Sequence, residues 1–213
     1  IFNLGCPAMD EIAEIDLGLG FDFFNRSGGS GDAIDQTQDY VVVLQHPVTT
    51  EYGKETHNIL ETIEAIKTVE MQTVWLWPNI DAGSDDISKQ LRQFSNSDKC
   101  FPLRLYRNFN MQNYTRLIYN AKCLVGNSSS GIREAAFLGV PSVNIGNRQL
   151  GRERGTNVID VPNDRKKITD AINKQILNGK CDIDKRFGDG NSGVAIAEIL
   201  ATVNPSIQKT MTY

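Results

Sequence analysis

The amino-acid sequence predicts an α/β protein with a Rossmann-like, doubly wound parallel sheet. From Tyr40 onward, short apolar runs alternate with longer stretches of helical spacing, a rhythm typical of βαβ units. Residues 55–70 place Ile59, Ile63 and Ile66 on one apolar stripe, as in a helix that covers a sheet. The 213 residues, 40% of them hydrophobic, are enough to bury the core of one such domain.

Six strands are expected, each a short apolar run bounded by polar or turn-forming residues. In chain order they cover residues 40–45, 73–77, 103–106, 123–126 and 142–145, with a shorter strand at 158–161. Helices are expected at about residues 55–70, 84–94, 111–120, 131–138, 164–177 and 193–203. Because helices join most of these strands, we expect a parallel sheet covered by helices on both faces.

The first 39 residues do not continue this rhythm. We interpret residues 1–39 as an N-terminal or interdomain segment, residues 40–203 as the Rossmann-like domain and residues 204–213 as a C-terminal tail. The stretch CPAMDEIAEIDLG could form a helix, whereas NRSGGSGDAIDQTQD is polar and glycine-rich and is expected to be a mobile loop. Its GGSG follows no strand and precedes no G-K-[ST], so it does not predict a phosphate loop.

Composition and charge argue against several classes of protein. A formal net charge of −4 is unlike that of a general nucleic-acid binder, which needs a basic surface. No run approaches the roughly 18 apolar residues of a membrane span, and the N-terminus lacks a signal-peptide layout, so we expect a cytoplasmic protein that binds no membrane.

Neither a metal nor a cofactor is expected. Without a C-x-x-C pair, the widely spaced cysteines are interpreted as reduced thiols: Cys6, Cys100, Cys123 and Cys181.

The stretch GNSSSG lies between the fourth expected strand and a helix. In an open parallel sheet such a turn lies at the carboxyl ends of the strands, where ligands bind. Free backbone N–H groups there attract a phosphate, and Ser128, Ser129 and Ser130 can add hydroxyl donors. Glu134 could accept two ribose hydroxyl hydrogens. The alternative is a capping box, in which Gly131 is the N-cap and Glu134 reaches back to it, but a cap needs only one small polar residue.

Basic and titratable residues follow two further strands. The loop NRQLGRERG carries Arg148, Arg152 and Arg154, and an arginine fork suits phosphate; Arg148, nearest the strand end, is favoured over the others. The alternative is a solvated loop. His46 directly follows the first strand and precedes Pro47. It can donate to a phosphate or transfer a proton near neutral pH, or its side chain can be satisfied by local backbone.

The stretch PNIDAGS follows the second strand. Its Asn79, Asp81 and Ser84 could bind a ligand, turn the chain or cap the next helix, and we expect Ser84 or Asp81 to cap that helix whatever the function. His57 lies inside an expected helix and is interpreted as a surface or half-buried residue. The second strand end therefore adds candidate ligand contacts without deciding among these roles.

A resemblance to a known family rests on four motifs: HPVTTE, PNIDAGS, GNSSSGIREAAFLGVPSVNIGNRQLGRERGTNV and FGDGNS. Together they closely resemble the hydrolysing UDP-N-acetylglucosamine 2-epimerases, specifically the branch that serves sialic-acid-type sugar pathways. The similarity runs from about Tyr40 to Ala201, and NLGCPAMD matches the segment where that family crosses between domains. It implies a glycosyltransferase-B-like fold of two Rossmann-like domains, of which this chain resembles the C-terminal half. The implied reaction is elimination of UDP to 2-acetamidoglucal, then hydration to N-acetylmannosamine.

The resemblance also implies roles for residues around the diphosphate and the ribose. Ser128 and Ser129 would hold the diphosphate of a UDP-N-acetylhexosamine, and Arg148 would lie on the phosphate side. Glu134 would bind the ribose hydroxyls. His46 matches a histidine that this family uses near the diphosphate, where it would assist the departing UDP. In this interpretation His46 is the one catalytic residue of the chain.

Two further positions would line the nucleotide pocket by resemblance, namely Asn79 and the backbone around Phe109. In the family, the carboxylates that remove and return the proton at C2 come from the N-terminal domain, and no segment here matches those motifs. The chain would then hold half of a UDP site and be nearly or wholly inactive without an N-terminal partner domain, either truncated or a separate polypeptide. Residues 193–213 would pack poorly without that domain.

Three alternatives stay open at this point. The substrate could be a related sugar such as UDP-diacetylbacillosamine, because the sugar contacts largely lie outside this chain. The chain could belong to a glycosyltransferase that shares the serine–glutamate nucleotide site, although HPVTTE and RQLGRERG favour the epimerase. It could also be a non-catalytic module that senses a UDP-sugar.

Overall fold

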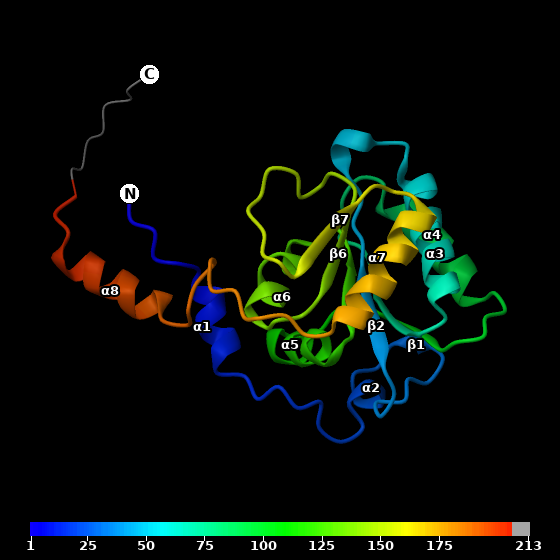
Figure 1. Cartoon of the computed structure of the whole chain (residues 1–213), viewed down its shortest axis with the longest axis horizontal. Coiled ribbons are helices and arrows are strands. Elements are labelled where there is room, and N and C mark those ends of the chain that lie inside the picture. Colours follow the sequence, from blue (N-terminus) through cyan, green and yellow to red (C-terminus); the bar gives the residue numbers. More distant parts are fainter. Residues whose placement is uncertain (206–213) are drawn as a thin grey trace.

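Seven strands form one sheet in the order β1-β4-β3-β2-β5-β6-β7 in the computed structural model, which describes residues 1–205 (Figure 1). The strands are β1 (Ser30–Gly31), β2 (Tyr40–Leu44), β3 (Gln72–Leu76), β4 (Leu103–Tyr106), β5 (Cys123–Gly126), β6 (Ser142–Ile145) and β7 (Val158–Val161). Neighbours from β4 to β7 pair in parallel, whereas β1 is antiparallel to β4. The predicted α/β class with a mainly parallel sheet is confirmed.

All six expected strands are present. The bounds of β4, β5, β6 and β7 are those that the sequence predicts. Strand β2 ends one residue earlier than expected, at Leu44, and β3 lies one residue earlier, over Gln72–Leu76. Apolar runs of this kind predict strands well because their residues are buried on both faces of the sheet, as the fully buried β2 shows.

The order of the strands creates a switch point between β2 and β5. From β2 the chain builds outward through β3 and β4, then returns to place β5 on the other side of β2. The parallel register brings Leu44 opposite Gly126, so the loops that leave these two strands start side by side. In open α/β sheets, ligands bind at such a point, outside the carboxyl ends of the strands.

Helices cover both faces of the sheet (Figure 1). They are α1 (Pro7–Ala13), α2 (Phe23–Arg26), α3 (Glu55–Val69), α4 (Ser84–Ser95), α5 (Met111–Asn120), α6 (Glu134–Phe137), α7 (Arg165–Asn178) and α8 (Ser192–Thr202). One core cluster joins α3, α4 and α7 to Val41 and Val43 of β2, and the other joins α1, α2, α5 and α6 to Val42 and Leu44. This alternation along β2 confirms the doubly wound arrangement.

The glycine-rich segment, expected as a mobile loop, contributes the edge strand β1. A Cβ atom on Gly31 would lie 2.4 Å from the backbone oxygen of Leu103, and one on Gly29 would lie 2.8 Å from the ring of Tyr106. The glycines therefore permit close contact with β4. Arg104 of β4 also binds this segment, because its Nε and Nη2 atoms both donate to the backbone oxygen of Gly28, at 2.9 and 2.7 Å.

Helix α8 projects from the rest of the fold beside α1 (Figure 1). The start of α8 is held by Asp10 of α1, whose two carboxylate oxygens accept the backbone N–H groups of Ser192 at 3.0 Å and Gly193 at 2.6 Å. The apolar side chains of α8 are largely exposed, with Val194 at 63% and Leu200 at 69%. The expected C-terminal tail lies outside the described residues from position 206 onward. In residues 1–205 no helix combines the length and the apolar composition that crossing a bilayer requires.

Candidate functional site

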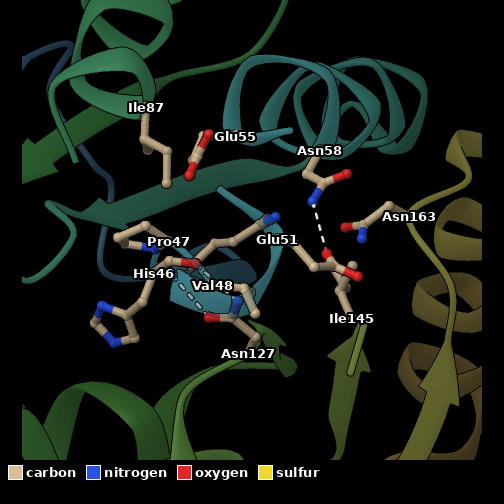
Figure 2. Close-up of a pocket in the computed structure, with 12 residues that line it drawn as sticks. His46, Pro47, Val48, Glu51, Glu55, Asn58, Ile87, Asn127, Ile145 and Asn163 are labelled. Atoms are coloured by element: carbon tan, nitrogen blue, oxygen red, sulfur yellow. Dashed lines mark hydrogen bonds between the residues drawn. The ribbon is translucent and has the colours of Figure 1, made fainter. Parts of the chain in front are cut away.

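His46 lies directly beyond β2, where the side chain of Asn127 holds its backbone. The Oδ1 atom of Asn127 accepts the His46 N–H at 2.7 Å, and its Nδ2 atom donates to the His46 carbonyl at 2.8 Å. Figure 2 shows this pair of bonds and the imidazole pointing away from Glu51 and Asn163. Asn127 follows β5, so the two bonds join the two strand ends at the switch point.

The imidazole of His46 is neutral at physiological pH. It is 6% exposed, and its Nδ1 atom accepts the backbone N–H of Asn79 at 3.1 Å. Burial, followed by the positive charge of Arg148, lowers the pKa of His46 to about 4, while Asp81 acts in the opposite direction. A neutral ring that accepts at Nδ1 carries its hydrogen on Nε2, so Nε2 is the donor that a ligand would meet.

The serine turn after β5 does not form the capping box that was the alternative to a ligand role. Ser128 caps a 3-10 turn over Ser129–Gly131, and helix α6 begins only at Glu134 and spans four residues. Gly131 is therefore not a helix N-cap, which excludes the capping alternative, and the helix expected at about 131–138 is shorter than predicted. The glycine is required by packing instead, because a Cβ atom there would lie 2.4 Å from the Oγ atom of Ser142.

The carboxylate of Glu134 also departs from the capping box. Its Oε1 atom lies 3.7 Å from Arg133, a long ion pair, and its buried Oε2 atom has no hydrogen-bond partner within residues 1–205. The side chain is only 14% exposed. A buried carboxylate oxygen without a partner is costly for a folded protein. The described residues therefore leave the hydrogen-bonding capacity of this oxygen unused.

A cleft of about 350 Å³ opens at the carboxyl ends of the central strands. It brings together His46, Asn79, Phe109 and Ser128, four of the seven residues predicted for the site. Its remaining lining residues are Leu44, Leu76, Trp77, Arg107, Asn108, Met111, Tyr114 and Ser130. The ring of Phe109 is stacked on Phe23, with a centroid distance of 5.9 Å, and so the loop after β4 rests on the second core cluster.

The other three predicted residues lie around this cleft rather than in its lining. Ser129 is half-buried in the serine turn beside Ser128. Glu134 follows on α6 and is close enough to Tyr114 to raise its pKa. Arg148 donates from Nη1 to the backbone oxygen of Asn127 at 3.2 Å and lines a second cleft of about 430 Å³, which borders the His46 loop.

The three arginines of the NRQLGRERG loop have different surroundings. Arg148 is half-buried, and its positive charge contributes to the lowered pKa of His46. Arg154 forms an ion pair with Asp160 on β7 and donates to the backbone oxygen of Gln149. Arg152 is exposed. The preference for Arg148 as the phosphate ligand stays a prediction.

The loop after β3 corrects a second expectation about capping. The N-cap of α4 is Gly83, with φ +92, which has no side chain to cap the helix, so neither Ser84 nor Asp81 has the predicted role. A Cβ atom on Gly83 would lie 2.5 Å from the Oε1 atom of Glu55, a buried residue at the start of α3. The loop that carries the Asn79 N–H thus packs directly on Glu55. His57, on the same helix, is exposed as expected.

Two residues of the site were missed by the sequence interpretation. Asn127 stands in the quoted GNSSSG motif, but its bonds to His46 span 81 residues and have no local signal. Tyr114 lies on α5, where helical spacing explains it equally well as a core residue, yet its hydroxyl group contacts Ser130 at 2.6 Å. Tyr114 lines the cleft itself, whereas Asn127 acts on it by holding the backbone of His46.

Known protein families provide an independent comparison. The sequence profile described as UDP-N-acetylglucosamine 2-epimerase matches residues 1–201, which is nearly the whole chain. This chain belongs to the UDP-N-acetylglucosamine 2-epimerase family. The match includes all the strand-end motifs that form the cleft, as well as α1 and α2.

Two relatives show how the chain relates to whole members of the epimerase family. It is 31% identical over 167 residues to a UDP-N-acetylglucosamine 2-epimerase of Neisseria meningitidis, covering 78% of this chain and 43% of that protein. It is 28% identical over 203 residues to a UDP-N,N'-diacetylbacillosamine 2-epimerase (hydrolyzing) of Legionella pneumophila, covering 95% and 52%. The chain therefore spans about half the length of these relatives.

Solved structures of the epimerase family confirm the fold. The Methanocaldococcus jannaschii UDP-GlcNAc 2-epimerase, in complex with UDP-GlcNAc and UDP, superposes with a TM-score of 0.67 at 21% identity. The superposition covers 94% of this chain and 54% of that structure. The Rossmann-like sheet described here is thus one part of a larger, glycosyltransferase-B-like architecture in such relatives.

Proposed function

We propose that this chain is the nucleotide-binding half of a hydrolysing UDP-N-acetylglucosamine 2-epimerase. The observation that carries this proposal is the convergence of donors on one cleft at the β2–β5 switch point, where the Nε2–H of His46 and the hydroxyl of Ser128 meet. A diphosphate is the part of a UDP-sugar that needs such donors. The whole reaction would convert UDP-N-acetylglucosamine and water into N-acetylmannosamine and UDP.

The proposed diphosphate contacts come from three strand ends. His46 donates from Nε2, Ser128 and Ser129 donate hydroxyl groups, and Arg148 supplies positive charge from the adjoining cleft. A neutral imidazole that accepts at Nδ1 still has the Nε2 hydrogen to donate to a phosphate oxygen. As UDP departs, negative charge grows on the oxygen that leaves C1, and a donor fixed by Asn79 and Asn127 stabilises that charge.

The proposed nucleoside contacts lie on the α5 and α6 side of the cleft. The carboxylate of Glu134, whose Oε2 atom has no partner within residues 1–205, accepts hydrogen bonds from the ribose hydroxyls. The backbone around Phe109 and the residue Asn79 bound the space for the uracil ring. Phe109 suits this role because its stacking on Phe23 holds the loop in place.

The chemistry at C2 is proposed to need groups beyond this chain. Elimination removes the proton at C2 as the C1–O bond to UDP breaks, so a general base must face the sugar. No Asp or Glu side chain lines the cleft in the described part of the chain. We therefore propose that the chain binds UDP by itself but needs an N-terminal domain for turnover, as the half-length match to its relatives supports.

The sugar has a second candidate. The Legionella relative, which aligns with 95% of this chain, is by name a UDP-N,N'-diacetylbacillosamine 2-epimerase. The nucleotide contacts proposed here are the same for both sugars. A comparison of the two UDP-sugars as substrates of the two-domain enzyme distinguishes them, since the correct one releases UDP faster.

Calorimetric titration with UDP tests the nucleotide proposal. The parent chain should bind UDP saturably, and Glu134→Gln should weaken binding by about tenfold, since it removes a charged acceptor from two hydrogen bonds. Glu198→Gln is the matched control, because Glu198 is exposed on α8, and it should bind as the parent does. Equal affinity of the parent and Glu134→Gln would contradict the ribose assignment, and no binding by the folded parent would contradict the proposal for this chain.

A further inference from the structure

Three hydroxyl groups in the lining of the cleft form a chain. The phenol oxygen of Tyr114 lies 2.6 Å from the Oγ atom of Ser130, which lies 3.0 Å from the Oγ atom of Ser128. Tyr114 is in the first turns of α5, and both serines belong to the turn after β5. The chain of hydroxyls therefore runs from a helix to the serine that faces the ligand space.

The direction of this hydroxyl chain follows from counting hydrogens. Ser130 donates its single hydroxyl hydrogen to Ser128, so it has none left for Tyr114, and the phenol must be the donor in the first bond. The backbone N–H of Ser130 also donates to the Oγ atom of Ser128, at 3.3 Å. Both lone pairs of the Ser128 hydroxyl are then occupied, and only its hydrogen remains available to a ligand.

We infer that Tyr114 is a positioning residue that makes the Ser128 hydroxyl a dedicated donor to a phosphate oxygen. The inference rests on the proposed function and deepens it, because it explains why the Ser128 hydroxyl would select a phosphate oxygen. An anionic oxygen carries lone pairs and no hydrogen, so it matches a hydroxyl that can only donate. A ligand group that needs an acceptor, such as an amide N–H, finds none at Ser128.

The surroundings of Tyr114 suit a fixed donor. Its ring packs against the second core cluster, which limits its rotation. Burial, and to a lesser degree the negative charge of Glu134, raises the pKa of the phenol, so it keeps its hydrogen throughout the physiological range. Without the phenol, Ser130 loses the hydrogen bond that favours donation of its own hydrogen to Ser128, so Ser128 can turn its hydrogen toward Ser130 instead of toward the ligand.

The test measures dissociation constants for UDP and for uridine by NMR titration of the chain. Tyr114→Phe keeps the packed ring and removes only the hydroxyl, and it should weaken UDP binding about fivefold while leaving uridine binding unchanged. Tyr119→Phe is the control, because Tyr119 lies on the same helix, outside the cleft lining, and contacts Lys180 through its ring. It should match the parent for both ligands, and thermal unfolding should show that each variant folds.

A second pair of variants distinguishes a relay from two separate contacts. Ser130→Ala should also weaken UDP binding, and the double variant Tyr114→Phe/Ser130→Ala should be no weaker than Ser130→Ala alone, because both act through one chain. UDP affinity of Tyr114→Phe equal to that of the parent would overturn the inference and leave the nucleotide site standing. Equal losses for UDP and uridine would overturn it as general damage to the cleft. A parent that binds no UDP would overturn the proposed function as well.

Discussion

The Nδ1 atom of His46 accepts the backbone N–H of Asn79 at 3.1 Å, so the loop after β3 fixes the tautomer of a side chain that follows β2. Because the hydrogen must then reside on Nε2, a main-chain contact determines what His46 offers to a ligand. The loop after β3 thereby determines which nitrogen of His46 can donate a hydrogen bond to a ligand.

The buried state of His46 predicts a pH dependence of stability. The pKa is about 4 in the folded chain and near 6.5 when unfolded, so between these values the unfolded chain binds more protons. The free energy of unfolding should therefore fall as the pH falls through this window, by about 2 kcal/mol between pH 7 and pH 5. Urea unfolding at both pH values measures it. His46→Gln should lack this component, and an equal pH dependence in parent and variant would contradict the neutral buried histidine.

Removal of the Asn127 side chain should destabilise the fold and the site together. Asn127→Ala leaves the N–H and the carbonyl of His46 without partners in a buried place, and should cost about 2 kcal/mol in the free energy of unfolding. Asn96→Ala is the control, since Asn96 is exposed at the end of α4. Urea denaturation at pH 7 measures both. A change below about 0.5 kcal/mol for Asn127→Ala would mean that these bonds do not hold the loop.

Gly126 should tolerate no side chain. Its φ is +134, and a Cβ atom would lie 2.0 Å from the backbone oxygen of Leu44, which cannot move without breaking the β2–β5 register. Gly126→Ala should therefore lower the free energy of unfolding by more than about 3 kcal/mol. Gly53→Ala shares a positive φ, +94, but meets open space, and should lose about 1 kcal/mol. Similar losses in both variants would show that backbone strain, not the close approach, explains Gly126.

The chain alone should release no product from UDP-N-acetylglucosamine. Among residues 1–205 the cleft lining supplies donors but no carboxylate to take the proton at C2, so rates should stay near the uncatalysed level. Chromatographic detection of UDP and N-acetylmannosamine measures this, with the full-length Neisseria relative as the active control. Turnover by the chain itself would place a general base among its own residues. It would contradict the proposal that an N-terminal domain supplies that base.

The sequence predicts the central sheet well because each buried strand is a local apolar run. It does not predict β1, since Ser30 and Gly31 carry no periodicity and pair with β4 only through tertiary packing. It overestimates α6, where a helical pattern is interrupted by the 3-10 turn that Ser128 caps. Side chains at strand ends, such as His46, are predictable from position, whereas the pairing of His46 with Asn127 depends on strand order, which no local pattern specifies.

The most direct test of the nucleotide site is hydrogen exchange of the chain with and without UDP. Binding at the switch point should slow exchange in the peptides that contain His46, Asn79, Phe109 and Ser128, while peptides of α8 should exchange at the same rate in both states. Protection confined to other segments, or equal exchange throughout at saturating UDP, would contradict the assignment of this cleft as the site that binds UDP.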